Sequence, residues 1–417
     1  MSAGAIAAVL IAQLVIAIAL ITPSTYSIAV WLDGLFPDTK DALLALAVGT
    51  SSLVSMIVGP IVGTLSDRTH ARWGPRRTWL LAGLAAGTAG SALLVSAASP
   101  AGLIVGWSTA AIGYGVANNI VLTHLSDRLP VSQRGLVLGL SSAVVYVGPV
   151  VGVLIAGAVS TARPLMFAIP AAAALLGGGL LAIVMADPPL STPREPFAAR
   201  RVLDGFWFSP RRYPRFGWVW LNRAIFFVGV SFMTLYSVFF LSSVLHLDPG
   251  QIALTASLAG VIGIVASTIA GTIAGALSDR ARSRLPFMVA GILLLCVGLL
   301  VIATSSTVAQ YVTGTSINAV AVGVYSAVGQ ALQFDELPAD DVQNGRYLAN
   351  LGLAMQIPNA VGPFIAAGVL ALAGGRYPFV YVAAAALVAL SILPLLPLRR
   401  RRRTGHPDPT HDRRSTP

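Results

Sequence analysis

The side chains that could bind a solute in this chain are neutral and lie about ten residues into long apolar segments. At a rise of about 1.5 Å per residue, that depth is close to the middle of a membrane-spanning helix. Amides and hydroxyls there could hydrogen-bond a sugar, a polyol or another neutral polar solute, and rings could stack on it. Alternatively, each amide joins two helices. The candidate residues are Gln13, Tyr114, Asn118, Tyr146, Ser231, Asn318, Tyr325 and Gln356.

Arg223 is a charged residue inside an apolar segment, LNRAIFFVGVSF, and we add it to these candidates. Its forked guanidinium could hold a carboxylate or phosphate of a solute. Alternatively, the long side chain extends to the nearby membrane surface, or it pairs with a carboxylate in a loop. Arg223 is roughly 9 Å past the expected start of its helix, which is short of the membrane midplane.

Two copies of one motif place an aspartate at the end of an apolar segment. The segment 59–77, GPIVGTLSDRTHARWGPRR, is related to 270–284, AGTIAGALSDRARSR, so that Asp279 corresponds to Asp67. Each copy runs through small residues into an Arg-rich loop, as a membrane helix does on reaching the cytoplasm. An arginine and a helix N-terminus can stabilise such a carboxylate, or the loops are simply solvated. The candidate gate residues are Gly63, Asp67, Arg68, Arg76, Arg77, Gly275, Asp279 and Arg280.

No carboxylate lies in the middle of an apolar segment. Membrane-embedded carboxylates are the usual carriers of protons and sodium ions, so sodium coupling of that kind is disfavoured. If a proton is coupled to solute movement, the candidates are Asp33 and His124, together with the two motif aspartates. The sequence has no His or Cys cluster and no phosphate loop of the form G-x-x-x-x-G-K, so we expect no metal, no cofactor and no enzymatic activity.

Membrane helices must position these side chains. Of the 417 residues 56% are hydrophobic and 10% are charged, with a mean hydropathy of +0.79, which is too apolar for a soluble globular protein. The net charge of +11 would also suit nucleic acid, but the arginines lie between apolar segments, so we expect a lipid bilayer and no nucleic acid. A bilayer core about 30 Å thick takes about 20 apolar residues per helix. We therefore predict twelve spans, at 3–30, 42–64, 78–97, 102–124, 136–158, 164–185, 217–241, 251–276, 286–305, 309–331, 346–371 and 377–398.

The arginines also predict orientation and domain boundaries. They gather in every second connection and in the tail, and cytoplasmic loops collect them, so we expect both termini in the cytoplasm. A cytoplasmic basic and aromatic linker at 187–216 separates six spans from six. We predict an N-terminal bundle at 1–186, a C-terminal bundle at 217–398 and a disordered basic tail at 399–417.

The two six-span units are repeats that run in the same direction. Leu129-Pro130 recurs at 337–338, and Gly148-Pro149 recurs at 362–363. These dipeptides fall at equivalent points of the two units. The predicted fold is therefore all-α, an integral membrane protein with twelve transmembrane helices in two parallel six-helix repeats.

Over essentially the whole chain to Leu398, these features resemble the major facilitator superfamily. The family signature after the second span reads roughly G-x-L-x-D-R-x-G-R-R, and Gly63, Leu65, Asp67 and Arg68 match it in place. Residues 69–73 are an insertion before the final G-x-R-R. The longer form, S-D-R-x-x-x-R-W-G-x-R-R, looks like the branch of the glycoside, pentoside and hexuronide cation symporters and the sucrose transporters. The resemblance implies two bundles that rock about a central solute site and are latched at the cytoplasmic side by the motif Asp and Arg.

The function that this resemblance implies is transport by alternating access. We expect a secondary active or facilitative transporter of a small polar organic solute such as a sugar, working as a monomer in a bacterial plasma membrane. If transport is coupled to an ion, the further partner is a proton. The alternatives are an efflux pump for drugs or secondary metabolites and a membrane sensor that moves no solute. An aromatic, apolar cavity would favour export, whereas an amide-lined cavity would favour uptake of a polar solute.

Overall fold

The structure, a computed structural model, describes residues 1–188, 210–336 and 344–398, and all regular elements in these ranges are helices. The N-terminal half comprises α1 (Ala3–Thr22), η1 (Pro23–Ser27), α2 (Ile28–Leu35), α3 (Lys40–Ser66), α4 (Pro75–Ser96), α5 (Pro100–Arg128), η2 (Val131–Gln133), α6 (Arg134–Ala158) and α7 (Leu165–Val184). The C-terminal half comprises α9 (Pro214–Leu235), α10 (Ser237–Ser243), α11 (Pro249–Arg280), α12 (Leu285–Ala303), α13 (Val308–Asp335), α14 (Asn344–Leu372), α15 (Tyr377–Leu390) and η3 (Leu393–Leu395). Most of the predicted linker and all of the predicted tail lie outside the described residues.

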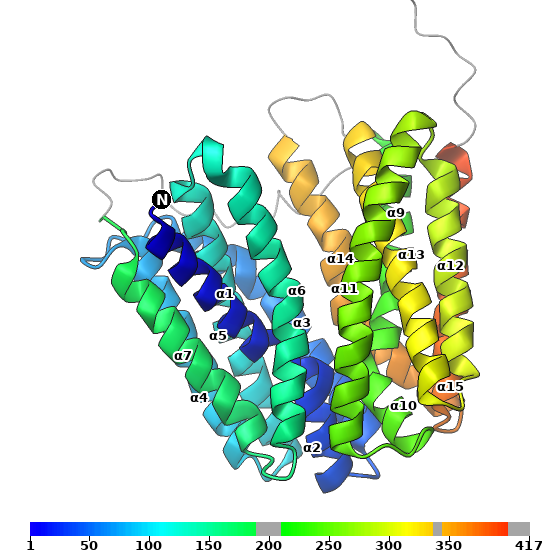
Figure 1. The fold of residues 1–417 in the computed structure, drawn as a ribbon, viewed down its shortest axis with the longest axis horizontal. Coiled ribbons are helices and arrows are strands. Elements are labelled where there is room, and N and C mark those ends of the chain that lie inside the picture. The colour runs from blue at the N-terminus through cyan, green and yellow to red at the C-terminus, as the bar shows by residue number, and fades with distance from the viewer. Residues whose placement is uncertain (189–209, 337–343, 399–417) are drawn as a thin grey trace, which may run out of the picture.

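Eleven helices in the described ranges are long and apolar enough to cross a membrane. By length and hydropathy alone, this is one fewer than the twelve spans that the sequence predicts. The predicted span 102–124 corresponds to α5, which has 29 residues but includes polar side chains such as Asn118 and Asn119. α5 packs against α4 and α3 inside the N-terminal half, so its polar residues need not meet lipid. Both described ends of the chain lie at the same end of the molecule (Figure 1). A chain that begins and ends on one side of a membrane crosses it an even number of times. The eleven apolar helices therefore need a twelfth crossing, which α5 supplies.

Prolines and polar caps fix the starts of several helices. Proline occupies the first turn of α4, α5, α9 and α11, where its missing N–H costs no intrahelical hydrogen bond. Ser99 caps α5, and Asp248 and Gln251 form a capping box at the start of α11. α9 begins at Pro214, inside the predicted linker 187–216, and its Phe216 is buried. The helices therefore extend the predicted spans by a few residues.

The two halves repeat one packing scheme, as the sequence predicts. α1 packs against α6 and α7 while α5 packs against α3 and α4; correspondingly, α9 packs against α14 and α15 while α13 packs against α11 and α12. Glycines allow the helices to approach closely. A Cβ atom added to Gly271 on α11 would lie 3.0 Å from the carbonyl oxygen of Gly323 on α13. The parallel six-helix repeat is thus confirmed in three dimensions.

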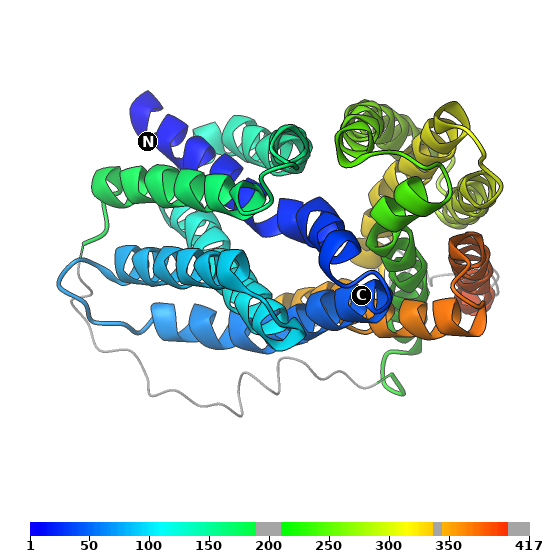
Figure 2. The same cartoon turned by 90° about the horizontal axis from the view of Figure 1, so that it is seen from below.

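The halves contact each other mainly through two pairs of helices, α3 with α14 and α6 with α11, and α2 also meets α10 while η1 meets α9. Their ribbons lie apart at the end that carries the N-terminus and close together at the opposite end (Figure 1), and Figure 2 shows the halves side by side. We call the end with Met1, Asp67 and Asp279 the open end. The end with Asp33 and Asp248 is called the closed end.

One π-helical turn, η1, interrupts the first helix at Pro23. Pro23 has no N–H to donate, and the hydroxyls of Ser24 and Thr25 donate to the Ile21 carbonyl at 2.9 and 3.0 Å. With α1 and α2 the turn forms a continuous span of 33 residues, Ala3–Leu35. Single π turns often mark functional sites, and this one brings Ser24 and Thr25 to a cavity between the halves.

Candidate functional site

A cavity lies between the two halves near the middle of the helices. One part, of about 460 Å³, is lined by α1, η1, α3 and α5 from one half and by α9 and α14 from the other. A second part, of about 440 Å³, shares Ser52, Ser55 and Asn359 with the first and extends toward the open end. The other lining residues are Leu20, Ile21, Ser24, Thr25, Val48, Ser51, Met56, Gly59, Pro60, Trp107, Ala111, Asn119, Ser231, Thr234, Leu235, Gln356 and Pro363.

The cavity is polar without being charged. Among the described residues that line it, none is Asp, Glu, Lys, Arg or His. The hydroxyls of Ser51 and Ser231 donate to carbonyls in their own helices at 2.9 and 2.7 Å. Such a hydroxyl keeps its lone pairs as acceptors for a ligand. Together with the amides of Asn119, Gln356 and Asn359, the lining offers both hydrogen-bond acceptors and donors to a polar ligand.

Two predicted pathway residues, Ser231 and Gln356, line this cavity. Tyr146 on α6 and Asn118 on α5 do not belong to either lining, although Asn119, the neighbour of Asn118, does. Tyr146 is exposed, whereas Asn118 is only half-buried. The roles of all four residues in the solute pathway stay predictions.

Four further candidates are buried inside one half, away from the cavity lining. Gln13 on α1 accepts a hydrogen bond of 2.7 Å from Ser141 on α6, so this amide joins two helices. Tyr325 donates to Asn222 at 2.7 Å. The remaining two are Tyr114, bonded to Ser91 at 3.1 Å, and Asn318, whose amide nitrogen lies 3.1 Å from the Met233 sulfur.

The predicted pathway set omitted Asn359, Ser52 and Ser55, which line both parts of the cavity. The prediction took one depth in each span and ignored the face of the helix. Ser52 and Ser55 are three residues apart, as are Gln356 and Asn359, and residues at this spacing share one helical face. That pairing of polar residues is the signal that would have found them.

Arg223 lies on α9, the helix that also carries the lining residue Ser231. Its guanidinium carbon is 5.2 Å from the centre of the Phe227 ring, and Nη2 is 3.9 Å from the Met355 sulfur. Met355 directly precedes Gln356, which lines the cavity. Arg223 therefore contacts the sequence neighbour of a lining residue but does not itself line either part of the cavity.

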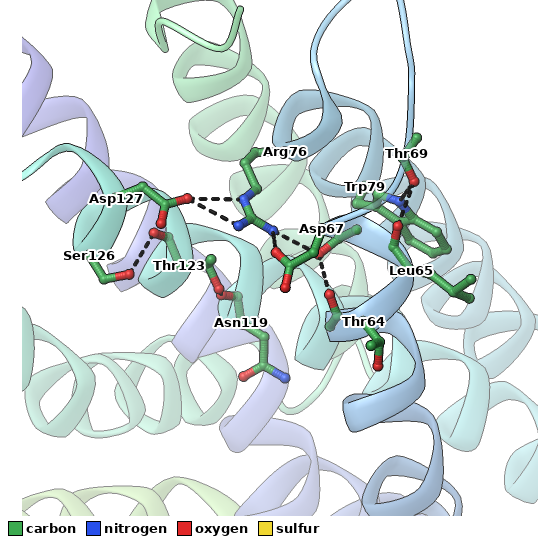
Figure 3. A network of polar contacts seen from close by, with 12 residues as sticks. Thr64, Leu65, Asp67, Thr69, Arg76, Trp79, Asn119, Thr123, Ser126 and Asp127 are labelled. Carbon is green, nitrogen blue, oxygen red and sulfur yellow. Dashed lines mark hydrogen bonds and ion pairs between the residues drawn. The ribbon is translucent and has the colours of Figure 1, made fainter. Parts of the chain in front are cut away.

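At the open end of the N-terminal half, Arg76 bridges two aspartates (Figure 3). Its Nη1 lies 2.6 Å from Asp67 and donates to the Ser66 hydroxyl at 2.9 Å, while Nε and Nη2 donate to Asp127 at 3.2 and 3.1 Å. Arg76 begins α4, and the two aspartates end α3 and lie in the last turn of α5. This cluster ties three helix ends together.

The C-terminal half repeats this cluster around Arg284. Its Nε donates to Asp335 at 3.2 Å, and its Nη1 donates to the Ser278 hydroxyl at 2.8 Å and pairs with Asp279. The hydrogen bond to Asp279 is the largest cause of a raised pKa for Arg284. The counterpart of Arg76 is therefore Arg284, whereas the predicted Arg280 is exposed at the end of α11. The repeat offset that relates Leu129 to Leu337 also relates Arg76 to Arg284, and could have shown this.

The other predicted gate residues lie around these clusters. Arg77 donates from Nη2 to the Met185 carbonyl at 2.6 Å, and its backbone N–H donates to Asp187 at 2.7 Å. Arg68 is half-buried next to Asp67. A Cβ added at Gly63 or Gly275 would have no atom within 4 Å. The ion pairs of Arg76 and Arg284 both stay within their own halves in this open conformation.

At the closed end, hydrogen bonds join the halves. Tyr377 donates to the Asp41 carboxylate at 2.8 Å, and Tyr236 donates to the Asp41 carbonyl at 3.3 Å. Asp33, a predicted coupling residue, pairs with Lys40 at 2.6 Å and accepts from Ser242 of the other half at 3.1 Å. These bonds close the cavity at this end.

His124, the other coupling candidate, is buried in the last two turns of α5, at the open end. It does not line the cavity. Within the described ranges, no group of three or more His, Cys, Asp or Glu is arranged to hold a metal ion.

The fold is similar to that of several solved transporters. A bacterial homologue of the human lysosomal transporter Spinster, inward-facing and unoccupied, has a TM-score of 0.72 at 16% identity, with 95% of this chain and 96% of that chain covered. A mutant of the nucleoside transporter NupG has a TM-score of 0.77 at 11% identity, with 94% and 99% covered. The xylose transporter XylE from E. coli, partially occluded and inward-open, has a TM-score of 0.65 at 15% identity, with 97% and 100% covered.

These identities are low, and the likenesses show the fold alone. Among curated protein sequences, none matches the chain. The family model of the Major Facilitator Superfamily, however, matches residues 6–274 and 264–416. The chain therefore belongs to the major facilitator superfamily and is a multi-pass membrane transporter, not an enzyme.

Proposed function

We propose that this transporter moves a small polar organic solute, with the size and hydrogen-bonding character of a sugar or polyol, by alternating access. The observation that carries the proposal is the cavity between the halves, whose polar lining consists mainly of hydroxyls and amides and which is lined by no charged residue among those described. The resemblance of the loop motif to that of the glycoside, pentoside and hexuronide symporters and the sucrose transporters supports the same class of solute. Trp107 in the lining offers a ring on which a sugar can stack.

In this proposal the open end faces the cytoplasm of a bacterial cell. The arginines of the chain gather in the connections at that end, and positive residues are retained on the cytoplasmic side. The described structure is then the inward-open state. The bonds of Asp41 and Asp33 with the other half seal the cavity from the outside.

A thermal-shift screen of the purified protein tests the solute class, because a ligand raises stability only by binding the folded state. The panel contains sugars and polyols, hydroxy acids, and lipophilic drugs. We expect stabilisation by a hydroxyl-rich compound, followed by its uptake into proteoliposomes. Stabilisation by lipophilic drugs alone would support the efflux pump. A stabilising compound that is never moved across the vesicle membrane would support the sensor.

Replacing Asn359 with alanine should weaken solute binding. Its amide reaches both parts of the cavity, and losing one or two hydrogen bonds to the solute should raise the half-saturation concentration by about five- to tenfold. Gln13→Ala is the matched control, because Gln13 bonds Ser141 inside one half. It should lower the melting temperature and leave half-saturation unchanged. The measurement is the half-saturation concentration for uptake by each variant. Equal increases in the two variants would contradict the proposal that the cavity binds the solute.

We also propose that Asp67 and Asp279 latch the open end when it closes. In this inward-open structure each aspartate pairs with an arginine of its own half, and the latch would form only when the open end closes and brings these charges to the other half. Replacing either aspartate with asparagine removes the negative charge that the latch needs, so the inward-open state should gain population and uptake should fall by at least about fivefold. Folding should be retained, since exposed ion pairs contribute little to stability. Alkylation of a cysteine placed at Gly59 in a Cys296→Ala background reports access from the open end. Asp38→Asn, at an exposed position of the closed end, is the control. Unchanged alkylation of the cysteine and full uptake in both Asp67→Asn and Asp279→Asn would refute the latch.

A further inference from the structure

Arg223 carries a positive charge that its surroundings do not neutralise. Among the described residues, no carboxylate lies within 4.0 Å of its guanidinium. Its Nε atom is buried and has no hydrogen-bond partner. Among the described residues its guanidinium contacts the Phe227 ring and the Met355 sulfur, which are weak partners for a cation, and Tyr325 is near enough to interact with it electrostatically. An unpaired arginine in a membrane helix is costly, so its presence calls for a function.

The contacts of Arg223 do not fit a side chain that extends to the membrane surface. Such a side chain would run from Arg223 toward Pro214, where α9 begins at the open end. Instead, the guanidinium lies against Phe227, one turn farther from that end, and against Met355, about 16 Å into α14 at 1.5 Å per residue. The charge is therefore held at the depth of the cavity.

The neutral cavity between the halves is the space that could receive the body of a solute bound by Arg223. Gln356 follows Met355 and lines the part nearer the open end, together with Asn119 and Asn359. A solute whose body occupies this neutral cavity can place one end group near the guanidinium. Nη2 makes only the weak contact with the Met355 sulfur, and the buried Nε has no partner, so a local movement of the side chain would bring both N–H groups to such a group.

We propose that Arg223 binds a carboxylate on the transported solute, so that the solute is a hydroxy acid rather than a neutral sugar. This inference rests on the proposed function and narrows its solute class. A carboxylate takes two parallel hydrogen bonds from a guanidinium and brings one negative charge, which matches the single positive charge here. A phosphate ester brings close to two charges, and no second cation lines the cavity in the described part of the chain.

Matched probes test the charge of the solute. Gluconate and sorbitol have the same six-carbon skeleton and differ at one end by a carboxylate in place of a hydroxymethyl group, and glucose 6-phosphate offers the alternative anion. Lactate, glycerate and quinate extend the panel of hydroxy acids. We expect at least one hydroxy acid to raise the melting temperature of the purified full-length protein, with its neutral counterpart and the phosphate ester having little effect. A panel in which no hydroxy acid stabilises the protein overturns the proposal.

Variants then assign the effect to Arg223. Arg223→Gln should raise the dissociation constant of the stabilising hydroxy acid by about ten- to hundredfold. Arg223→Lys should recover only part of the lost affinity, because lysine cannot donate two parallel hydrogen bonds to a carboxylate. Arg211→Gln removes the same charge at an exposed position before α9 and is the control. Size-exclusion profiles of the unliganded variants should match that of the parent protein. Unchanged affinity in Arg223→Gln, or full rescue by lysine, overturns the proposal.

The outcomes separate this inference from the proposed function. Binding and uptake of sorbitol or glucose, equal in the parent protein and in Arg223→Gln, would refute the role of Arg223 and leave polar-solute transport standing. Binding confined to lipophilic drugs would refute both.

Discussion

Replacing Gly113 with leucine is expected to prevent the protein from folding, whereas leucine at Gly115, two residues along the same helix, should be tolerated. A Cβ added at Gly113 would lie 2.2 Å from the backbone nitrogen of Gly87 on α4, which cannot move aside as a side chain could. At Gly115 no atom lies within 4 Å of an added Cβ. Overpacking against backbone should cost about 3 kcal/mol or more, at the upper end of the usual range.

Size-exclusion profiles and thermal melting of the two variants provide the measurement. The expected result for Gly113→Leu is little or no monodisperse protein, and for Gly115→Leu a profile like that of the parent. The substitution should also disrupt the cavity, because Trp107 and Asn119 in its lining lie on α5. A well-folded Gly113→Leu protein would show that α4 and α5 do not pack as closely as described.

The fold was largely predictable because the bilayer restricts it to apolar helices of a set length. The predicted span 42–64, for example, lies within α3, and the repeat relation holds in the packing of both halves. α5 was predicted as a span but falls short of the others in apolarity, since some of its polar residues contact other helices, as Tyr114 contacts Ser91, and Asn119 lines the cavity.

The cavity was less predictable, because the composition of a helix does not reveal which face meets which neighbour. Gln13 and Gln356 are the same residue type at similar depths, yet Gln13 joins α1 to α6 and Gln356 lines the cavity. Only tertiary packing distinguishes them. Asp127 and Asp335 were missed for a different reason: they lie far in sequence from the motif whose arginines they bind.

A disulfide between the halves is expected to stop transport almost completely. Val150 on α6 and Gly260 on α11 face each other across the two halves, and a Cβ added to Gly260 lies 3.9 Å from the Val150 Cβ. That separation falls within the range of about 3.5–4.5 Å that disulfides span. Ser257, one turn before Gly260, donates to the Val150 carbonyl at 3.3 Å, so these helices are already in contact. A covalent bond there would hold the inward-open state.

The protein for this experiment carries Val150→Cys and Gly260→Cys with Cys296→Ala, which removes the native cysteine. Each single-cysteine protein serves as a control for oxidation. The measurement is the initial rate of solute uptake into proteoliposomes before oxidation, after oxidation and after reduction, alongside the fraction cross-linked. The account predicts that uptake falls in proportion to the cross-linked fraction and returns on reduction. Full uptake by completely cross-linked protein would contradict alternating access about this cavity.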